Sequence, residues 1–220
     1  MKKIIVLTTV VTALSIPSAF AKTEGSYLGI NVLRAKSDVK STSSSSTNAD
    51  TYFNTKTKDS QTGFGINYKY AINMNNFFIA PGVFLEKIGS ESKVNDTENG
   101  YNQSVNIKSR YGVKFDAGYD ITDKFSVYAP FGISMANYEL KTQDYSGASS
   151  LTTKTTGRKA GFLYGLGFSF AATENILVNL EYNRSSYDLK SGGNVALIGN
   201  TTLKAKTNLD VVTLGVAYKF

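Results

Sequence analysis

Apolar and polar residues alternate with a period of two in eight separate stretches of the chain. Near the C-terminus, Val212, Leu214 and Val216 share one face of such a stretch, whereas Thr213 and Gly215 share the other. Because side chains on a β-strand point alternately to opposite faces, this pattern predicts strands with one apolar face. The predicted strands cover residues 25–36, 61–72, 77–87, 105–121, 124–140, 160–171, 176–187 and 208–220.

The connections between these strands are alternately long and short. The short turns are residues 73–76, 122–123 and 173–175, and the long polar connections are residues 37–60, 89–104, 141–159 and 188–207. A Ser-rich polar composition, as at residues 41–47, cannot bury a core and predicts a long mobile loop. Short turns on one side and long loops on the other are typical of outer-membrane barrels. We therefore predict an all-β fold, an eight-stranded antiparallel transmembrane β-barrel with long extracellular loops and short periplasmic turns.

The alternative is a soluble eight-stranded barrel, which would place its large apolar side chains inside. The apolar face carries large aromatic residues on most strands, whereas the opposite face is rich in Gly, Ser, Ala and Asn. Eight strands enclose just enough room for side chains, so we expect that many rings to overfill the interior. Aromatic residues also gather beside the short turns, where an interfacial girdle is expected: Tyr70, Phe77, Tyr119, Phe125, Phe170, Tyr218 and Phe220. The apolar face is therefore predicted to contact lipid.

The two ends of the chain fit the same hypothesis. Residues 1–21 contain Lys2 and Lys3, a short apolar run at residues 4–16 and an Ala-x-Ala site, which together predict a cleavable signal peptide. Residues 22–220 then form the barrel domain. The last predicted strand ends on Phe220, and because an open strand edge is unfavourable in lipid, we expect this strand to pair with the first.

Several charged residues occupy the predicted inward face. Unpaired charges in a water-poor interior cost several kcal/mol each, so we expect the acidic residues to pair with neighbouring Lys or Arg. Such pairs would form either a plugging network or a gated ion path. The predicted interior network is Lys69, Glu86, Lys108, Arg110, Lys114, Asp116, Glu181 and Lys219.

Composition excludes several classes of function. The chain has no Cys and no His, which removes disulfides, the usual metal ligands and the commonest general base. A net charge of +7 without a clustered basic stripe gives no indication of nucleic-acid binding. We therefore predict no enzymatic activity, no cofactor and no bound metal.

The remaining candidates for function are basic and aromatic residues in the long connections. Basic residues mixed with aromatic residues suit an acidic or amphipathic protein partner, and the alternative is a solvated surface with no partner. The predicted partner-binding residues are Lys40, Tyr52, Phe53, Lys56, Lys58, Lys93, Tyr101, Tyr145, Lys154, Arg158, Lys159 and Lys204.

Four stretches spread along the chain resemble a known family: S-Y-L-G-I-N, G-F-L-Y-G-L-G-F-S-F, N-L-E-Y-N and the closing L-G-V-A-Y-K-F. They resemble the opacity-protein-like eight-stranded barrels and, more narrowly, the small surface adhesins of rickettsiae. The resemblance implies attachment to host cells and capture of serum proteins such as vitronectin. We expect the barrel to be a monomer in the bacterial outer membrane, with its loops at the cell surface. Phe220 resembles the terminal aromatic residue that barrel-assembly machinery recognises. A small porin-like barrel and a purely structural barrel remain as alternatives.

Overall fold

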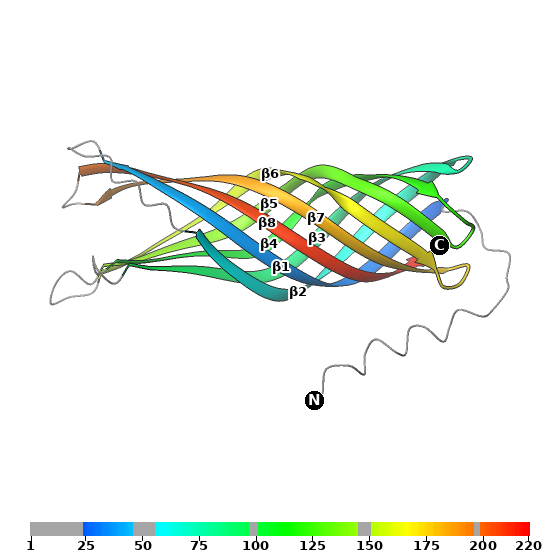
Figure 1. Cartoon of the computed structure of the whole chain (residues 1–220), viewed down its shortest axis with the longest axis horizontal. Coiled ribbons are helices and arrows are strands. Elements are labelled where there is room, and N and C mark those ends of the chain that lie inside the picture. The colour runs from blue at the N-terminus through cyan, green and yellow to red at the C-terminus, as the bar shows by residue number, and fades with distance from the viewer. Residues whose placement is uncertain (1–23, 46–55, 97–100, 145–150, 196–198) are drawn as a thin grey trace, which may run out of the picture.

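The computed structural model of the protein is a closed barrel of antiparallel strands (Figure 1). It describes residues 24–45, 56–96, 101–144, 151–195 and 199–220, so the predicted signal peptide lies outside the described residues. No helix in these ranges is long and apolar enough to cross a membrane. The strands are β1 (Gly25–Ser45), β2 (Lys56–Met74), β3 (Phe77–Asp96), β4 (Tyr101–Asp120), β5 (Phe125–Asp144), β6 (Leu151–Ala171), β7 (Ile176–Val195) and β8 (Gly199–Lys219).

The barrel closes between its first and last strands. Leu28 of β1 lies opposite Tyr218 of β8, and Val32 lies opposite Leu214. Every other strand pairs with its neighbours in the sequence. Closure leaves no open strand edge, which is what a lipid environment requires. The predicted eight-stranded antiparallel barrel and its closing terminal strand are therefore confirmed.

Three short turns join strands at the end of the barrel that also holds Phe220 (Figure 1). In the first turn Asn75 adopts a φ of 62°, a left-handed conformation that Asn tolerates better than most residues. The other two turns share one device, in which a Thr hydroxyl accepts hydrogen bonds from the backbone. Thr122 accepts from the N–H of Phe125 at 3.1 Å, and Thr173 accepts from that of Ile176 at 3.0 Å.

The strands continue far beyond their predicted ends at the opposite, extracellular rim. Each has 19 to 21 residues, whereas roughly 9–11 suffice to cross a bilayer. β1 continues to Ser45 and β2 begins at Lys56, so much of the predicted loop at residues 37–60 is strand. The same correction applies to residues 89–104, 141–159 and 188–207. Outside lipid neither strand face needs to be apolar, so the alternating pattern disappears although backbone pairing continues.

A belt of outward-pointing apolar side chains surrounds the half of the barrel nearest the short turns. Ile30 is 68 % exposed, Phe64 63 %, Phe162 60 % and Leu214 57 %. A continuous apolar surface of this extent is unfavourable in water and suits the hydrocarbon of a bilayer. Aromatic pairs border the belt beside the turns, for example Tyr218 and Phe220, whose ring centroids are 5.2 Å apart.

Three residues of β4 lie on the face opposite to the predicted one. Alternation over the predicted strand at residues 105–121 puts Val105 and Ile107 on its apolar face, toward lipid, and Lys108 inside. Val105 and Ile107 are instead buried inside, whereas Lys108 is exposed on the outer wall. The strand contains a β-bulge between Ile107 and Ser109. Because a bulge inserts one extra residue, every side chain beyond it changes face. Period-two alternation across the bulge therefore gave wrong assignments for these three residues.

The barrel interior also contains more large side chains than its small-residue pattern suggested. Phe78 and Tyr128 are buried inside, with 1 % and 3 % exposure. Glycines on neighbouring strands make room for them, because a methyl group at Gly118 would overlap the Phe78 ring and one at Gly167 the Tyr128 ring. The expectation that aromatic rings would overfill the interior was therefore too strict.

Buried apolar side chains form two clusters, one toward each end of the interior. Leu33, Ile107, Tyr187 and Leu209 belong to the extracellular cluster. The cluster nearest the short turns contains Tyr27, Ala71, Phe78, Ala80, Tyr128, Leu177 and Ala217. The charged interior residues lie between these clusters along the strands.

Candidate functional site

The centre of the barrel is occupied by a chain of buried ion pairs. The Lys69 ammonium lies 3.0 Å from one oxygen of Asp116, and the Lys114 ammonium lies 3.6 Å from the other. Lys114 also reaches Glu181, at 2.5 Å. All four side chains are less than 10 % exposed. Because each carboxylate has at least one cationic neighbour, the desolvation cost of these charges is offset by their mutual attraction.

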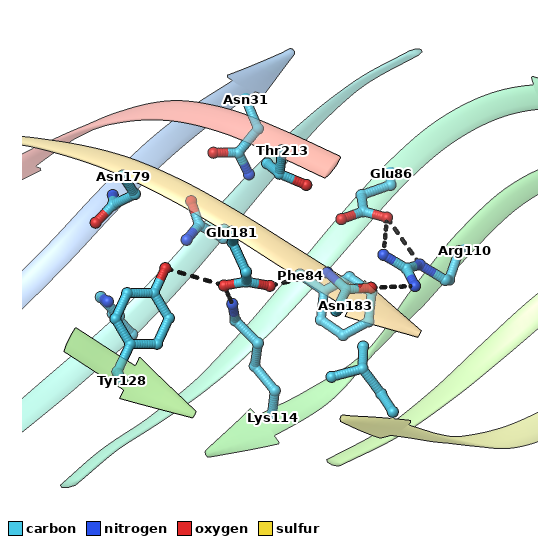
Figure 2. A pocket seen from close by; sticks show the side chains of 13 residues that line it. Asn31, Phe84, Glu86, Arg110, Lys114, Tyr128, Asn179, Glu181, Asn183 and Thr213 are labelled. Carbon is cyan, nitrogen blue, oxygen red and sulfur yellow. Dashed lines mark hydrogen bonds and ion pairs between the residues drawn. The ribbon is translucent and has the colours of Figure 1, made fainter. Parts of the chain in front are cut away.

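Neutral side chains extend this chain toward β5 and β7 (Figure 2). The Tyr128 hydroxyl donates to Oε2 of Glu181 at 3.1 Å, and the Asn183 amide donates to Oε1 at 2.9 Å. The ammonium of Lys69 also lies over the ring of Tyr128, 4.9 Å from its centroid. These contacts fix the carboxylate of Glu181 in one orientation.

Arg110 forms the second part of the network (Figure 2). Its side chain is fully buried, and its Nε donates to Oε2 of Glu86 at 2.8 Å. Its Nη1 donates to the Asn183 amide oxygen at 2.8 Å and to the Ser185 hydroxyl at 3.0 Å. The guanidinium lies over the ring of Phe84, 5.3 Å from the centroid. Asn183 therefore connects the two parts of the network through its two amide atoms.

The network is charge-balanced and leaves little free space. Its three cations are matched by three carboxylates, all on the inward face. A cavity among these side chains offers about 20 Å³ for the centre of a water molecule. A cavity of that size accommodates about one water and no larger solute. With an apolar cluster on either side, this arrangement is chemically a plug.

The structure places the eight predicted interior residues in three environments. Lys108 is on the outer wall, where its ammonium lies 2.6 Å from Glu139. Lys219 is half-buried on the inward side at the turn end of β8. The other six form the buried network: Lys69, Glu86, Arg110, Lys114, Asp116 and Glu181.

The predicted partner-binding residues do not form one described loop cluster. Tyr52, Phe53 and Tyr145 lie outside the described residues. The other nine are in strands, which corrects their predicted placement in loops: Lys40, Lys56, Lys58, Lys93, Tyr101, Lys154, Arg158, Lys159 and Lys204. On β6, Lys154 and Arg158 are exposed and Lys159 is half-buried.

Sequence reasoning missed four residues that complete the network. Tyr128 lies between Val127 and Ala129, which fall on the apolar face of the predicted strand at residues 124–140. Period-two alternation therefore already placed Tyr128 inside, and the same signal was present for Phe84, Asn183 and Ser185. Their contacts with particular charged partners depend on how the strands are staggered around the barrel.

No group of three or more His, Cys, Asp or Glu side chains that could hold a metal ion occurs in the described ranges. A closed barrel with an outward apolar belt, a filled interior and strands that continue past one rim defines a small outer-membrane β-barrel protein. The chain matches the family described as outer membrane protein beta-barrel domain over residues 6–220, and it belongs to this family. The predicted outer-membrane location and the likeness to opacity-type barrels are thereby confirmed, whereas the narrower likeness to rickettsial adhesins stays a prediction.

The chain is similar to several known outer-membrane proteins. It is 24 % identical over 229 residues to the virulence membrane protein PagC of Salmonella typhimurium, with 100 % of both chains covered. It is 28 % identical over 108 residues to the 31 kDa outer-membrane immunogenic protein of Brucella melitensis, covering 49 % of this chain and 44 % of that one. The solved structure of OprG from Pseudomonas aeruginosa matches with a TM-score of 0.63 at 16 % identity, covering 91 % and 98 %. This last match reflects a shared fold.

Proposed function

We propose that the protein is a non-enzymatic adhesin whose extracellular end binds a host cell-surface or serum protein. One observation carries the proposal: the barrel interior is plugged, while much of the folded chain lies beyond the lipid belt. More than half of β1 follows Val32, and more than half of β8 precedes Val212, which are the last apolar residues of these strands described as exposed. A barrel built only to span the membrane has no need of these extensions.

The extensions provide a preformed platform for a partner. A binding surface made of paired strands loses less conformational entropy on binding than long mobile loops do. Basic residues occupy neighbouring positions on it, since Lys40 is the register partner of both Lys56 and Lys206. Such a surface suits an acidic protein segment. The resemblance to rickettsial adhesins makes vitronectin the first serum protein to test.

The names of two relatives support a surface role. PagC is a virulence membrane protein and is similar to this chain over its full length. The Brucella relative is an outer-membrane immunogenic protein, although the likeness covers about half of this chain. Insertion of this chain is proposed to depend on the barrel-assembly machinery acting on its terminal Phe220, and the inserted barrel is proposed to be a monomer.

A transplant of the extracellular half tests the adhesin proposal. Residues 37–60, 89–104, 141–159 and 188–207 are placed on the trunk of an inert eight-stranded barrel displayed by a non-adherent bacterium. The chimera is expected to gain binding to host cells or to immobilised vitronectin. The matched control carries the same segments with Lys40, Lys56 and Lys58 changed to Gln. A chimera that is surface-exposed and shifts on a gel only after heating, yet binds no host protein, refutes the proposal.

The alternative of a small pore is tested by planar-bilayer conductance. The two apolar clusters on either side of the ion-pair network oppose a continuous water path, so we expect no resolved channel openings. Conductance that disappears in Lys114→Met or Glu181→Met would instead favour a pore gated by this pair. A purely structural barrel predicts that shortening all four extracellular connections leaves host-cell attachment unchanged.

A further inference from the structure

We propose that the outer wall of β3 to β6, just above the lipid belt, binds phosphate groups of outer-leaflet lipids. Lys154 and Arg158 are also among the predicted partner-binding residues, whereas Lys87 and Lys108 lie outside the extracellular segments that are proposed to bind a host protein. Five cationic residues define it, and the name basic wall is used for them below: Lys87, Lys108, Lys141, Lys154 and Arg158.

Strand register places the basic wall immediately beyond the last apolar rows. Val83, Val113, Ile133 and Phe162 are register partners in one row, and all are about half-exposed. Two positions along each strand toward the extracellular side, Leu85, Tyr111, Met135 and Ala160 form a second row. Two positions further the row is Lys87, Ser109, Asn137 and Arg158. Between the second and third rows, the side chains on this wall therefore change from mostly apolar to cationic or hydrogen-bonding.

The height of this row matches the headgroup layer. At a rise of about 3.3 Å per residue and a strand tilt of about 40°, Arg158 lies roughly 10 Å above Phe162 along the membrane normal. By the same arithmetic Lys87 lies roughly 5 Å above Leu85. The polar layer of a bilayer begins at the hydrocarbon edge and is roughly 5–8 Å thick. Both cations thus lie at or just above lipid phosphates.

Among the described residues, the basic wall has more cations than carboxylates. Glu139 is the single described carboxylate within ion-pair distance of it, 2.6 Å from Lys108 and 3.3 Å from Lys141. No described carboxylate pairs with Lys87, Lys154 or Arg158. Lys141 and Lys154 are also direct register partners, and like charges placed opposite each other on a sheet are destabilising. A bridging anion removes that repulsion.

The opposite wall, on β7, β8 and β1, supplies a contrast at the same height. Its described cations are Arg34, Lys36, Arg184 and Lys206, and its described carboxylates are Asp38, Asp188 and Asp210. Arg184 is held by both oxygens of Asp210, at 2.6 and 2.9 Å. This wall is nearly neutralised by the protein itself, so an anion is expected to prefer the basic wall.

Lipid phosphate fits the basic wall better than a protein partner does. The wall faces sideways, and its lower row is level with the headgroups, while Lys141 and Lys154 lie two rows further from the lipid belt. The lower row offers hydrogen-bond donors across about 14 Å, which is three interstrand spacings. The Arg158 guanidinium and the Lys87 ammonium lie at its two ends, and the hydrogen-bonded pair Ser109 and Asn137 lies between them. Arg binds phosphate through paired hydrogen bonds, and basic residues at a membrane surface favour anionic lipid by roughly fivefold each.

A spin-label experiment on the full barrel tests the site directly. The chain has no Cys, so Thr156→Cys on the basic wall and Asn208→Cys on the opposite wall, facing Asp38 of β1, each accept one label. Each protein is placed in phosphatidylcholine bilayers containing a minor fraction of lipid A, and phosphorus NMR measures the broadening of the lipid A phosphates. Several-fold stronger broadening is expected from the label at position 156. Equal broadening from both labels overturns the proposal.

Matched triple variants identify the residues responsible. Lys87→Gln/Lys154→Gln/Arg158→Gln is expected to lower the enrichment of lipid A at the label by at least about tenfold. Arg34→Gln/Lys36→Gln/Lys206→Gln removes the same charge from the opposite wall and is expected to change it little. If both variants lower the lipid A enrichment equally, the net charge of the barrel attracts the lipid, and the proposal of a specific site is wrong. Soluble polyglutamate is tested separately, in bilayers without lipid A. If it binds near the label while lipid A is not enriched there, the basic wall is a site for an acidic protein and not for lipid.

Discussion

Replacing Arg110 tests whether the interior network stabilises the barrel or merely fills it. Arg110→Met keeps a long apolar side chain but removes the guanidinium. The carboxylate of Glu86, itself 5 % exposed, then loses the partner at 2.6 Å that compensates its burial. Asn183 and Ser185 also lose the donor that reaches both of them. The cavity that Glu86, Arg110 and Asn183 line accommodates about one water.

Breaking a buried ion pair by removing one partner typically costs about 3–5 kcal/mol. We therefore expect Arg110→Met to lose about 3–5 kcal/mol from the free energy of unfolding, a large share of the roughly 5–15 kcal/mol of a typical domain. The double variant Glu86→Met/Arg110→Met removes both charges, and it should recover about 2–3 kcal/mol of that loss. Lys108→Met is the control, because this cation of the same strand is exposed, and it should show no measurable loss.

The assay is urea unfolding of each variant in detergent micelles, followed by tyrosine fluorescence and by heat-dependent gel mobility. The coupling energy between positions 86 and 110 comes from the four proteins of the double-mutant cycle. If the double variant is as unstable as the sum of the single variants, the pair carries no coupling. The network would then be interior filling, and the reasoning from uncompensated charge would be wrong.

Three further predictions follow from particular contacts. Gly118→Ala overlaps the ring of Phe78 and should cost about 1–3 kcal/mol of unfolding free energy, which Phe78→Leu in the same protein should largely restore. The hydrogen bond from Arg184 holds the pKa of Asp210 below its ordinary value. The ionised carboxylate therefore stabilises the fold at any pH above the pKa of Asp210 in the unfolded chain, which is about 3.9. This stabilisation is lost as the pH falls through the lower pKa of Asp210 in the folded protein. The difference in unfolding midpoint between wild type and Asp210→Asn should therefore be full near about pH 7 and shrink below about pH 4, and a difference that grows with acidity contradicts the sign. Deleting Phe220 should lower the heat-modifiable fraction recovered in outer membranes, whereas Phe220→Tyr should retain it, and unchanged recovery after deletion would exclude an assembly role.

The plugged interior and the extended rim together limit what the barrel can do. A charge-balanced network between two apolar clusters fills the described interior, which opposes a path for solutes and favours activity directed outward, to lipid or to a partner. The outer surface divides by height into an apolar belt, a cationic zone and the extracellular extensions. The proposed lipid site shares Lys141, Lys154 and Arg158 with the segments of the proposed host-binding end, whereas Lys40, Lys56 and Lys58 can be changed without altering the basic wall.

The sequence by itself determined the fold class, the number of strands and most lipid-facing positions. Alternation places Ile30, Phe64 and Leu214 on the apolar faces of the predicted strands at residues 25–36, 61–72 and 208–220, and all three are exposed. Alternation is informative there because the lipid face of a spanning strand must be apolar while the inward face need not be. The short turns were equally readable, since Asn and Thr favour the backbone conformations and hydrogen bonds that such turns use.

Only the tertiary structure decided the strand ends, the faces beyond the bulge and the partners of the buried charges. Above the membrane neither face must be apolar, so Lys40 and Lys56 gave no sign that they lie in paired strands. The bulge at Lys108 adds one residue without a distinctive local sequence, yet it exchanges inside and outside for everything beyond it. The contacts of Arg110 with Glu86 and Asn183 depend on how the strands are staggered around the closed barrel. Alternation along a single strand carries no information about that stagger.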